Sequence, residues 1–536
     1  MLKSIYRVII AMTIITVFIP GCNIFFSSKD SKLDENPNTD DLPEIEEVSA
    51  NWADAGVQGG IPNYAIGIDV TLPPYNASGN GITDDSQAIL DAIADCPEGQ
   101  AVYLPAGSYR TTETIEIKKS IALRGDGPNA TTVIHNHDGY GIYFLAGADR
   151  AGIEDLHVHT AWTGFNSYGG TKIQFENIEN SWIRNIETSG YVGETIKLIA
   201  ASHCEIRDSY IHNSEAETVS VSEFRSYGVE PFGEGANHNL IENNVFDWFR
   251  HAVCLNYESD YNVIAYNFSW NVWTVDGGTS NTTDMEFHHY NYDTDSQFVN
   301  YTLVEGNLFE QGTFASHEHN TALRNRINNG GFGVKRNNSF IGNEFVEKKH
   351  PGTWNENIIT DIGENSVVHG NYILAESGIQ WDPSIEDRSI PDSYYLSEKP
   401  EWFGDLDWPC YGGDLMERTN GNNTRRSPAE VRYWSIRFPE ASPSDLSAQI
   451  VGGSVELSWT NNSSTDVDFI VCRSTDNVSF TRIGYTDKNI TAYADTTANS
   501  GRTYYYYVKA RNYLGGENGD NLGGESLPSN AVSLLL

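Results

Sequence analysis

The chain of 536 residues is poor in basic side chains, with 34 Lys and Arg against 73 Asp and Glu, and its formal net charge at pH 7 is −39. A field of that sign repels phosphate backbones and anionic lipid headgroups at long range. We therefore expect no nucleic-acid partner. An acidic excess of this size is typical of an exported protein that must stay soluble in salty surroundings.

Cysteine is also scarce, with six in the whole chain. No pair has Cys-x-x-Cys spacing, so the sequence gives little support for a structural zinc site. If Cys22 is modified, an odd number remains, which cannot form a complete disulfide framework. Cys254, within Ala-Val-Cys-Leu, is best interpreted as a small buried apolar residue.

The apolar run from Val8 to Ile19 follows Lys3 and Arg7, and it is too short to be a stable membrane span. It predicts a signal peptide over residues 1–22. Its end, Ile19-Pro20-Gly21-Cys22, resembles the bacterial lipobox. The resemblance implies lipidation of Cys22, and thus an exported lipoprotein of the outer membrane or cell surface, with secretion as the alternative. The membrane would then be contacted only through the lipid. Residues 23–50, rich in Ser, Asp and Glu, predict an acidic flexible tether.

The main internal pattern is a repeat in which aliphatic residues precede an Asn or Asp. Successive copies lie 18 to 40 residues apart, as expected for a unit near twenty residues with insertions. A solenoid of short strands would bury the aliphatic residues and stack the Asn side chains at one corner, so the pattern favours a parallel β-helix over an Asn-rich sandwich. The repeated positions are Asn185, Asp208, Asn244, Asn267, Asn307, Asn325, Asn343 and Asn371.

Residues 65–127 contain three further motifs: Gly81-Ile-Thr-Asp-Asp85 before a helix-like stretch, Ala101-Val-Tyr-Leu-Pro-Ala-Gly-Ser-Tyr109, and Leu123-Arg-Gly-Asp-Gly127. Here the chain resembles the N-terminal module of the pectate-lyase-like superfamily. The resemblance covers about residues 65–390 and implies a right-handed parallel β-helix and a polysaccharide partner. Thr83 and Asp84 would cap a helix over residues 86–94 that covers the end of the solenoid.

The later part of the chain changes character. We assign 51–440 to the β-helix, with 384–440 wrapping along it. From Pro443 onward, alternating segments such as Ser454–Trp459 and Thr503–Ala510 predict a β-sandwich. Residues 441–536 resemble a fibronectin type III domain. Alternation places Tyr504 and Tyr506 on one face of a strand, and Tyr505 and Tyr507 on the other.

Equivalent positions of successive coils lie about 4.8 Å apart, so a solenoid face can align side chains into columns. The strands beginning Glu194-Thr-Ile, Glu217-Thr-Val and His251-Ala-Val can be aligned by their sequences. The alignment predicts a column of Glu194, Glu217 and His251. Two carboxyls one coil apart are near the separation used by retaining glycosidases.

The longest insertion, between Asn267 and Asn307, contains a second set of titratable residues. Alternation in Asp284–His289 places Asp284, Glu286 and His288 on one side, while His317 and Lys335 each lie ten residues beyond a repeat Asn. The predicted catalytic set is Glu194, Glu217, His251, Asp284, Glu286, His288, His317 and Lys335, with Arg250, His289, Arg326 and Arg336 as substrate-binding residues.

Three functions remain open. Hydrolysis by paired carboxylates is preferred, because acids and His outnumber bases on this face and the acidic field opposes polyanionic substrates. Elimination would use His288, His317 or Lys335 as the base, and an arginine or a calcium ion would neutralise a uronate. The third is a glycan-binding surface protein without activity. Beyond that calcium ion, no cofactor or metal site is predicted.

Overall fold

The computed structural model describes the second of two compact units, which begins at Ile45, from Trp52 onward. The residues left outside the description are 1–51, 163–169, 191–192, 213–225, 271–284, 289–298, 316–318, 334–336, 347–358, 361–362, 374–377, 419–424, 438–440, 464–466, 478–479 and 513–525.

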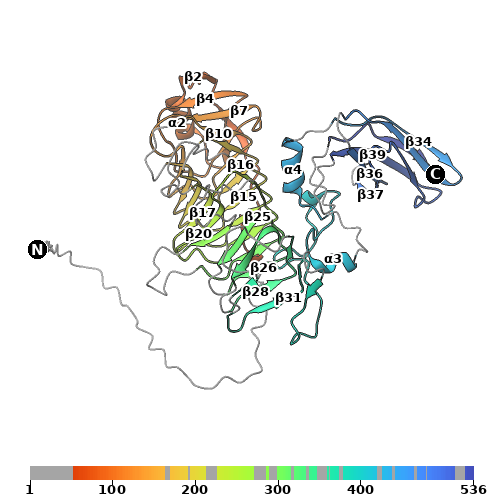
Figure 1. The fold of residues 1–536 in the computed structure, drawn as a ribbon. Helices are drawn as coiled ribbons and strands as arrows, with labels where there is room; N and C mark the ends of the chain where they lie inside the picture. The colour runs from red at the N-terminus through yellow and green to blue at the C-terminus, as the bar shows by residue number, and fades with distance from the viewer. Residues whose placement is uncertain are drawn as a thin grey trace, which may run out of the picture. The chain divides into compact units, whose positions relative to one another are not determined.

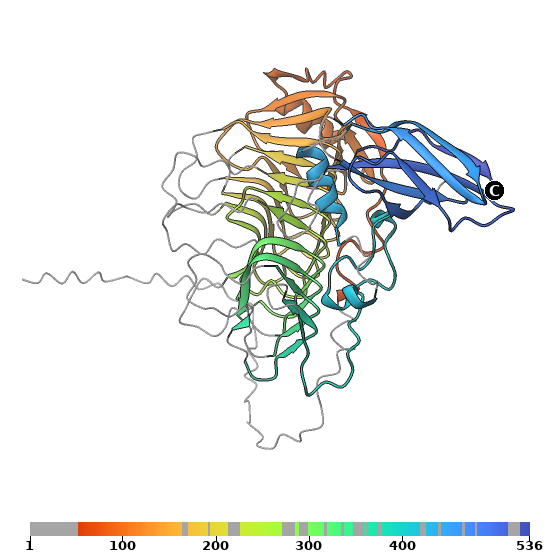
Figure 2. The same ribbon diagram turned by 45° about the vertical axis from the view of Figure 1, so that its right-hand side comes forward.

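Three sheets, here called A, B and C, form a parallel β-helix. From Gln100 to His288 each coil contributes one strand to each sheet in turn, and the later coils contribute their described strands to sheets A and B. The coils stack in chain order, as the colour sequence in Figures 1 and 2 shows. The parallel β-helix predicted from the Asn repeat is therefore confirmed.

Sheet A has short strands of three to five residues. In stacking order they are β1 (Ala65–Asp69), β3 (Gln100–Tyr103), β6 (Ala122–Arg124), β9 (Gly152–Glu154), β12 (Trp182–Arg184), β15 (Glu205–Arg207), β18 (Leu240–Glu242), β21 (Val263–Ala265), β24 (Leu303–Glu305), β26 (Thr321–Leu323), β28 (Ser339–Ile341) and β31 (Val367–His369).

Sheet B is parallel except at its last strand, which pairs antiparallel with its neighbour. Its strands are β2 (Asn80–Asp84), β4 (Gly107–Thr111), β7 (Thr131–His135), β10 (His157–Thr160), β13 (Glu187–Ser189), β16 (Tyr210–His212), β19 (Val245–Asp247), β22 (Phe268–Trp270), β25 (Leu308–Ala315), β27 (Arg326–Gly333), β29 (Glu344–Phe345), β32 (Asn371–Ile373) and β33 (Gly378–Gln380), with β30 (Ile359–Thr360) beside β27.

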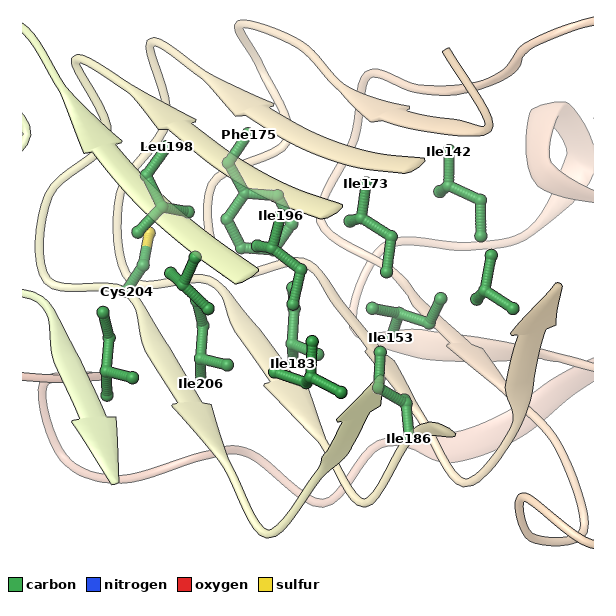
Figure 3. Close-up of a cluster of buried hydrophobic side chains, with 14 of the residues drawn as sticks. Ile142, Ile153, Ile173, Phe175, Ile183, Ile186, Ile196, Leu198, Cys204 and Ile206 are labelled. Atoms are coloured by element: carbon green, nitrogen blue, oxygen red, sulfur yellow. The ribbon is translucent and has the colours of Figure 1, made fainter. Parts of the chain in front are cut away.

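Sheet C is formed by β5 (Ile115–Ile117), β8 (Ile142–Phe144), β11 (Thr171–Glu176), β14 (Glu194–Ile199), β17 (Tyr227–Phe232), β20 (His251–Asn256) and β23 (Met285–His288). Alternation along these strands directs aliphatic residues inward. Figure 3 shows Ile173 and Ile196 of sheet C above Ile153 and Ile183 of sheet A, all fully buried. Each such side chain contributes about 1.5–3 kcal/mol by burial.

The corner from sheet A to sheet B is a two-residue turn in coil after coil, such as Asn185 and Ile186 between β12 and β13. Its second residue forms the predicted ladder: the Asn307 amide donates to Asn325 Oδ1 at 3.0 Å and accepts from the Asn267 amide at 3.0 Å. The corner from sheet B to sheet C varies instead, from 248–250 before β20 to 213–226 before β17.

Two members of the predicted ladder belong to a neighbouring column. Asn185 and Asp208 are the first residues of their turns, with φ of 50° and 57°. Asn185 donates to Asp155 at 2.7 Å, and Asp208 accepts from Asn243 at 2.7 Å. The in-register amide ladder runs from Asn244 to Asn371.

The helix α2 (Ser86–Asp95) packs against β5, and its Ile89, Ala92 and Ile93 enter the solenoid core. This agrees with the expected cap on the end of the solenoid. The N-cap position is Asp85, one residue later than predicted, while Asp84 accepts from the Ser86 backbone N–H at 3.1 Å.

The described residues of 381–437 pack along the outer side of sheet A and of the adjoining strands of sheet B, and they form the segment that we call the wrap. It contains η3 (Glu401–Phe403), α3 (Gly413–Arg418) and α4 (Pro428–Arg437). Trp52, Phe403 and Tyr411 share one core with Leu303 and Leu323 of sheet A. The buried Arg324 ties the two together, because its guanidinium donates to Asp414 at 2.9 and 3.0 Å. The predicted wrapping of 384–440 is confirmed for the residues described.

Residues 444–535 form two antiparallel sheets. Trp459, Phe469, Tyr504 and Tyr506 are buried in their common core, as the alternation predicted for the two tyrosines. One sheet contains β34 (Ser444–Val451), β35 (Ser454–Thr460) and β38 (Ala492–Asp495); the other contains β37 (Thr481–Tyr485), β36 (Val467–Ser474), β39 (Thr503–Asn512) and β40 (Val532–Leu535). None of the helices that the structure describes is long and apolar enough to cross a lipid bilayer.

Candidate functional site

The outer face of sheet C collects polar side chains in register. Because alternate residues of β11, β14 and β17 point inward, the residues between them form an outward column. Neighbouring strands pair Glu116 with Tyr143, Tyr143 with Gln174, Gln174 with Lys197, and Lys197 with Glu230 along this column.

Two carboxylates meet one lysine in this face, and we call Glu194, Lys197 and Glu230 the lysine cluster. Lys197 Nζ lies 3.0 Å from Glu230 Oε2 and 3.5 Å from Glu194 Oε1. Those two oxygens are therefore no more than 6.5 Å apart, which is the sum of the two distances. The ammonium group also lies 4.6 Å from the ring centroid of Phe232, a cation–π contact. The lysine is 11% exposed and the two carboxylates are almost fully covered.

Glu230 of the lysine cluster lies in an environment that shifts the pKa of its carboxyl group. Burial raises the pKa of its carboxyl, with Glu194 adding to the rise and Lys197 opposing it. Asn256 Nδ2 donates to Glu230 Oε1 at 2.6 Å. Asn256 Oδ1 is buried and has no hydrogen-bond partner among the described residues. The site therefore contains a carboxyl that tends to keep its proton, beside an amide oxygen that can still accept a hydrogen bond.

The predicted column of Glu194, Glu217 and His251 is only partly correct. Glu194 pairs with Tyr227, and Tyr227 pairs with His251, so Tyr227 occupies the coil that the alignment gave to Glu217. His251 is buried, with its ring centroid 5.4 Å from that of Tyr227. Glu217 lies outside the described residues. The local sequence resembled a strand start, but the strand of this coil is β17, ten residues later.

Most members of the second predicted set of titratable residues, which begins in the insertion between Asn267 and Asn307, lie outside the residues that the structure describes. The backbone of β23 places Glu286 beside Cys254 and His288 beside Asn256, so both have register positions on sheet C next to the lysine cluster. His317 and Lys335 were predicted to lie in one column of adjacent coils. Strands β25 and β27 pair with the same residue offset as far as Ala315 and Gly333. The residues outside the description are Asp284, His289, His317, Lys335, Arg336 and the lipidation candidate Cys22.

The two remaining arginines differ in position. Arg250 lies at the corner before β20, where its backbone N–H donates to the Ser226 carbonyl at 3.2 Å. Arg326 begins β27 in sheet B, is 3% exposed, and lies close enough to Glu430 of the wrap to oppose the rise of that pKa. Its predicted role in binding substrate on the same face as Glu194 is therefore wrong, because the wrap covers it.

Sequence reasoning missed a group of histidines on sheet B. His157 Nε2 and His159 Nδ1 lie 2.6 and 2.9 Å from Ser189 Oγ. One coil on, His212 Nε2 lies 2.8 Å from Glu187 Oε1. The period-two pattern His157-Val-His159 was a usable signal, since Val158 is buried and its neighbours must point outward.

Lys172 at the start of β11 connects these histidines to sheet C. Its Nζ donates to the carbonyl oxygens of Ser189 and Gly190, the latter at 3.1 Å, and burial lowers its pKa to about 7. Burial likewise lowers the pKa of His157 to about 4 and that of His159 below its usual value. At neutral pH these groups are wholly or partly unprotonated. We call His157, His159, His212, Glu187 and Lys172 the histidine cluster.

Acidification should destabilise the protein through His157. Its pKa is about 4 in the folded chain and 6.5 for an unperturbed imidazole, so the folded chain binds fewer protons between these values. The stabilisation is complete above pH 6.5 and declines as the pH falls towards 4. At pH 5 this loss amounts to about 2 kcal/mol. The measurement is the free energy of unfolding in urea at pH 7.5 and at pH 5. Between these pH values His157→Gln should lose less stability than the wild type, by that amount. An equal loss in both proteins would contradict a neutral, buried His157.

Within the described part of the chain, no three His, Cys, Asp or Glu side chains are placed to hold a metal ion. The five cysteines described, Cys96, Cys204, Cys254, Cys410 and Cys472, are buried thiols that form no disulfide with one another. Burial of Cys254 agrees with its expected role as an apolar residue.

Comparison with known proteins relates part of the solenoid to a described family. Residues 72–246 match the family model described as rhamnogalacturonase A/epimerase, pectate lyase-like. This match confirms the resemblance to the pectate-lyase-like superfamily over that part of the chain, and it contains Glu194, Lys197, Glu230 and the histidine cluster.

A probable rhamnogalacturonase C of Aspergillus niger is 43% identical over 67 residues, which is 12% of this chain and 14% of the relative. The match therefore spans about a seventh of that relative's length. Among solved structures, the Dettilon tailspike protein has a TM-score of 0.42 at 12% identity, covering 84% of this chain and 82% of its own. Pectate lyase Pel9A has a TM-score of 0.40 at 13% identity, covering 60% and 82%. At these scores neither structure bears on function.

Proposed function

We propose that the protein is an exported carbohydrate-active enzyme that cleaves glycosidic bonds of an extracellular polysaccharide. The observation that carries the proposal is the lysine cluster: two carboxylates converge on Lys197 in the outer face of sheet C, inside the segment that matches the family model. The name of the relative from Aspergillus niger supports a polysaccharide as substrate.

Hydrolysis is the preferred reaction. The raised pKa of Glu230 suits a general acid that protonates the leaving oxygen, and Glu194 would be the second carboxylate. The limit of 6.5 Å between their oxygens is compatible with the roughly 5–5.5 Å carboxyl separation of retaining enzymes. Glu194 would then attack the sugar carbon while the glycosidic bond breaks and Glu230 protonates the leaving oxygen. Water deprotonated by Glu230 would next displace Glu194 from the sugar, so the product would keep the anomeric configuration of the substrate.

Elimination at a uronate is the alternative, and the histidine cluster favours it. A base must be unprotonated at the working pH, as His157, His159 and part of the Lys172 population are. His288, His317 and Lys335 stay proposals for the same role. The reaction would also need a cation beside the uronate carboxylate to neutralise its charge. For this role we propose Arg250 or a calcium ion.

Product analysis distinguishes the reactions. Purified full-length protein is incubated with a panel of neutral and uronate polysaccharides, and both new reducing ends and absorbance near 235 nm are followed, since an unsaturated uronate absorbs there. We expect reducing ends without absorbance. New reducing ends together with absorbance near 235 nm would show that the reaction is elimination and not hydrolysis. The absence of both signals with every polysaccharide of the panel would contradict enzymatic activity and favour a glycan-binding surface protein.

The ends of the chain complete the proposal. A signal peptide over residues 1–22 and lipidation of Cys22 would place the enzyme at the outer membrane or cell surface, with 23–50 as the tether. For the C-terminal sandwich we propose a fibronectin type III topology. Its two sheets, in the orders β34-β35-β38 and β37-β36-β39-β40, support this assignment.

A further inference from the structure

A cavity of about 520 Å³ opens on the outer face of sheet A, on a different sheet from the lysine cluster. Strands β12, β15 and β18 form its floor, and residues 53–61 and the wrap form its sides. The charged and aromatic side chains of its lining are Arg184, Arg207, Glu205, Asp208, Glu242, Tyr395 and Trp402.

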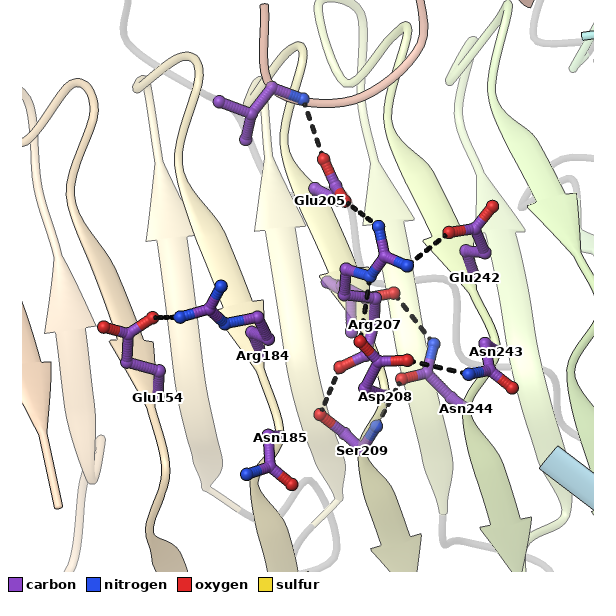
Figure 4. A network of polar contacts seen from close by, with 12 residues as sticks. Glu154, Arg184, Asn185, Glu205, Arg207, Asp208, Ser209, Glu242, Asn243 and Asn244 are labelled. Atoms are coloured by element: carbon purple, nitrogen blue, oxygen red, sulfur yellow. Dashed lines mark hydrogen bonds and ion pairs between the residues drawn. The ribbon is translucent and has the colours of Figure 1, made fainter. Parts of the chain in front are cut away.

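The floor of the cavity is held rigidly by ion pairs, seen in Figure 4. Arg207 is bound on three sides, by Glu205 at 2.9 Å, Asp208 at 3.0 Å and Glu242 at 3.1 Å. Tyr395 reaches down from the wrap and donates to Glu242 Oε1 at 2.7 Å. These contacts fix the positions of the polar atoms before any ligand arrives, which lowers the entropic cost of binding.

Two donor groups in the lining have hydrogen-bonding capacity left. Arg184 Nη2 is paired with Glu154 Oε2 at 2.6 Å, and no other partner of this guanidinium occurs among the described residues. The indole N–H of Trp402 likewise has no acceptor in the described part of the chain. Arg184 is one-third exposed, and Trp402 is half-buried with Arg207 5.9 Å from its ring centroid.

Charge decides which ligand fits. The carboxyl groups of Glu205, Asp208 and Glu242 outnumber the guanidinium groups of Arg184 and Arg207 in the lining, so an anionic ligand finds no net positive charge there. A neutral sugar ring presents hydroxyl groups that both donate and accept, together with an apolar C–H face that an indole can cover. Free donors, carboxylate acceptors and an aromatic ring lie together in this cavity.

We infer that the cavity binds a neutral pyranose unit of a polysaccharide through Arg184, Trp402 and the carboxylates around Arg207. This site would retain the polymer on sheet A while bonds are cleaved at sheet C. The inference rests on the proposed function only for the class of ligand, because binding here needs none of the residues of the lysine cluster.

The test is affinity electrophoresis of the full-length protein in native gels containing β-1,4-galactan, xylan or sodium polygalacturonate. Trp402→Ala and Arg184→Gln should each weaken retardation by a neutral polysaccharide by about tenfold in apparent Kd. The matched control is Trp381→Ala, because Trp381 also belongs to the wrap and also carries an arginine, Arg388, at 5.5 Å, but lies outside this cavity. Its retardation should equal that of the wild type.

Several outcomes would overturn the inference. These are no retardation of the wild type by either neutral polysaccharide, unchanged retardation in both cavity variants, or retardation by polygalacturonate alone. Arg184→Gln keeps the test valid if Trp402→Ala unfolds, because Arg184 is partly exposed and its loss removes one ion pair. Cleavage with no binding at this cavity would refute the inference and leave the proposed function standing.

Discussion

Glu230→Gln is expected to reduce glycan cleavage by about a thousandfold while the chain remains folded, because general acid catalysis contributes about 10²–10⁴. The substitution keeps the shape of the side chain and the neighbouring Asn256, but it removes the proton that burial makes the carboxyl retain. The measurement is kcat on the polysaccharide found by the product screen, with far-ultraviolet circular dichroism to confirm the fold.

The matched control is Glu305→Gln. Glu305 is also a buried glutamate, and burial raises its pKa to about 7, but it lies in sheet A, where Tyr266 donates to it at 2.8 Å. Its activity should stay within about threefold of the wild type, since the change at Glu305 does not touch sheet C. Full activity in Glu230→Gln would remove the lysine cluster from the reaction.

Asn307→Ala should destabilise the solenoid by about 3–5 kcal/mol. The Asn307 amide donates to the Ile264 carbonyl at 2.8 Å and to Asn325 Oδ1 at 3.0 Å, and its oxygen accepts the backbone N–H of Asn267 at 2.9 Å. Alanine leaves these groups buried without partners. Urea unfolding of the full chain gives the change in the free energy of unfolding.

Asn185→Gly provides the comparison for that measurement. Asn185 is exposed, belongs to the neighbouring column, and has a left-handed backbone that glycine adopts without strain. The expected cost is below about 0.5 kcal/mol. Equal costs at the two positions would mean that the stacked amides contribute nothing beyond an exposed turn.

The sequence allowed the solenoid to be predicted because its strongest constraint is local. A two-residue turn with an amide at its second position recurs from coil to coil, as in Glu-Asn-Asn244 and Ala-Tyr-Asn267, and strand partners then follow from the repeat. The errors at Asn185 and Asp208 arose because Asn and Asp also favour the left-handed first position of such a turn.

The candidate site was harder to predict because its strands follow the variable corner. Glu230 lies in Tyr227-Gly-Val-Glu-Pro-Phe232, and a central strand containing Gly and Pro conflicts with the usual composition of sheets. The register of β17 is set by its pairing with β14 and β20, at Tyr227 against Glu194 and His251. Aligning Glu217-Thr-Val with Glu194-Thr-Ile led to Glu217 instead. The histidine cluster was missed because sheet B was not considered as a face for chemistry.

The contrast between the two corners has a practical consequence for engineering. An insertion between sheets A and B would break an amide stack that neighbouring coils share, whereas the connection into sheet C already differs in length from coil to coil. Foreign peptides, or segments meant to change specificity, should therefore be grafted before β17 or β20. The stacking of the coils does not depend on one fixed length of that connection.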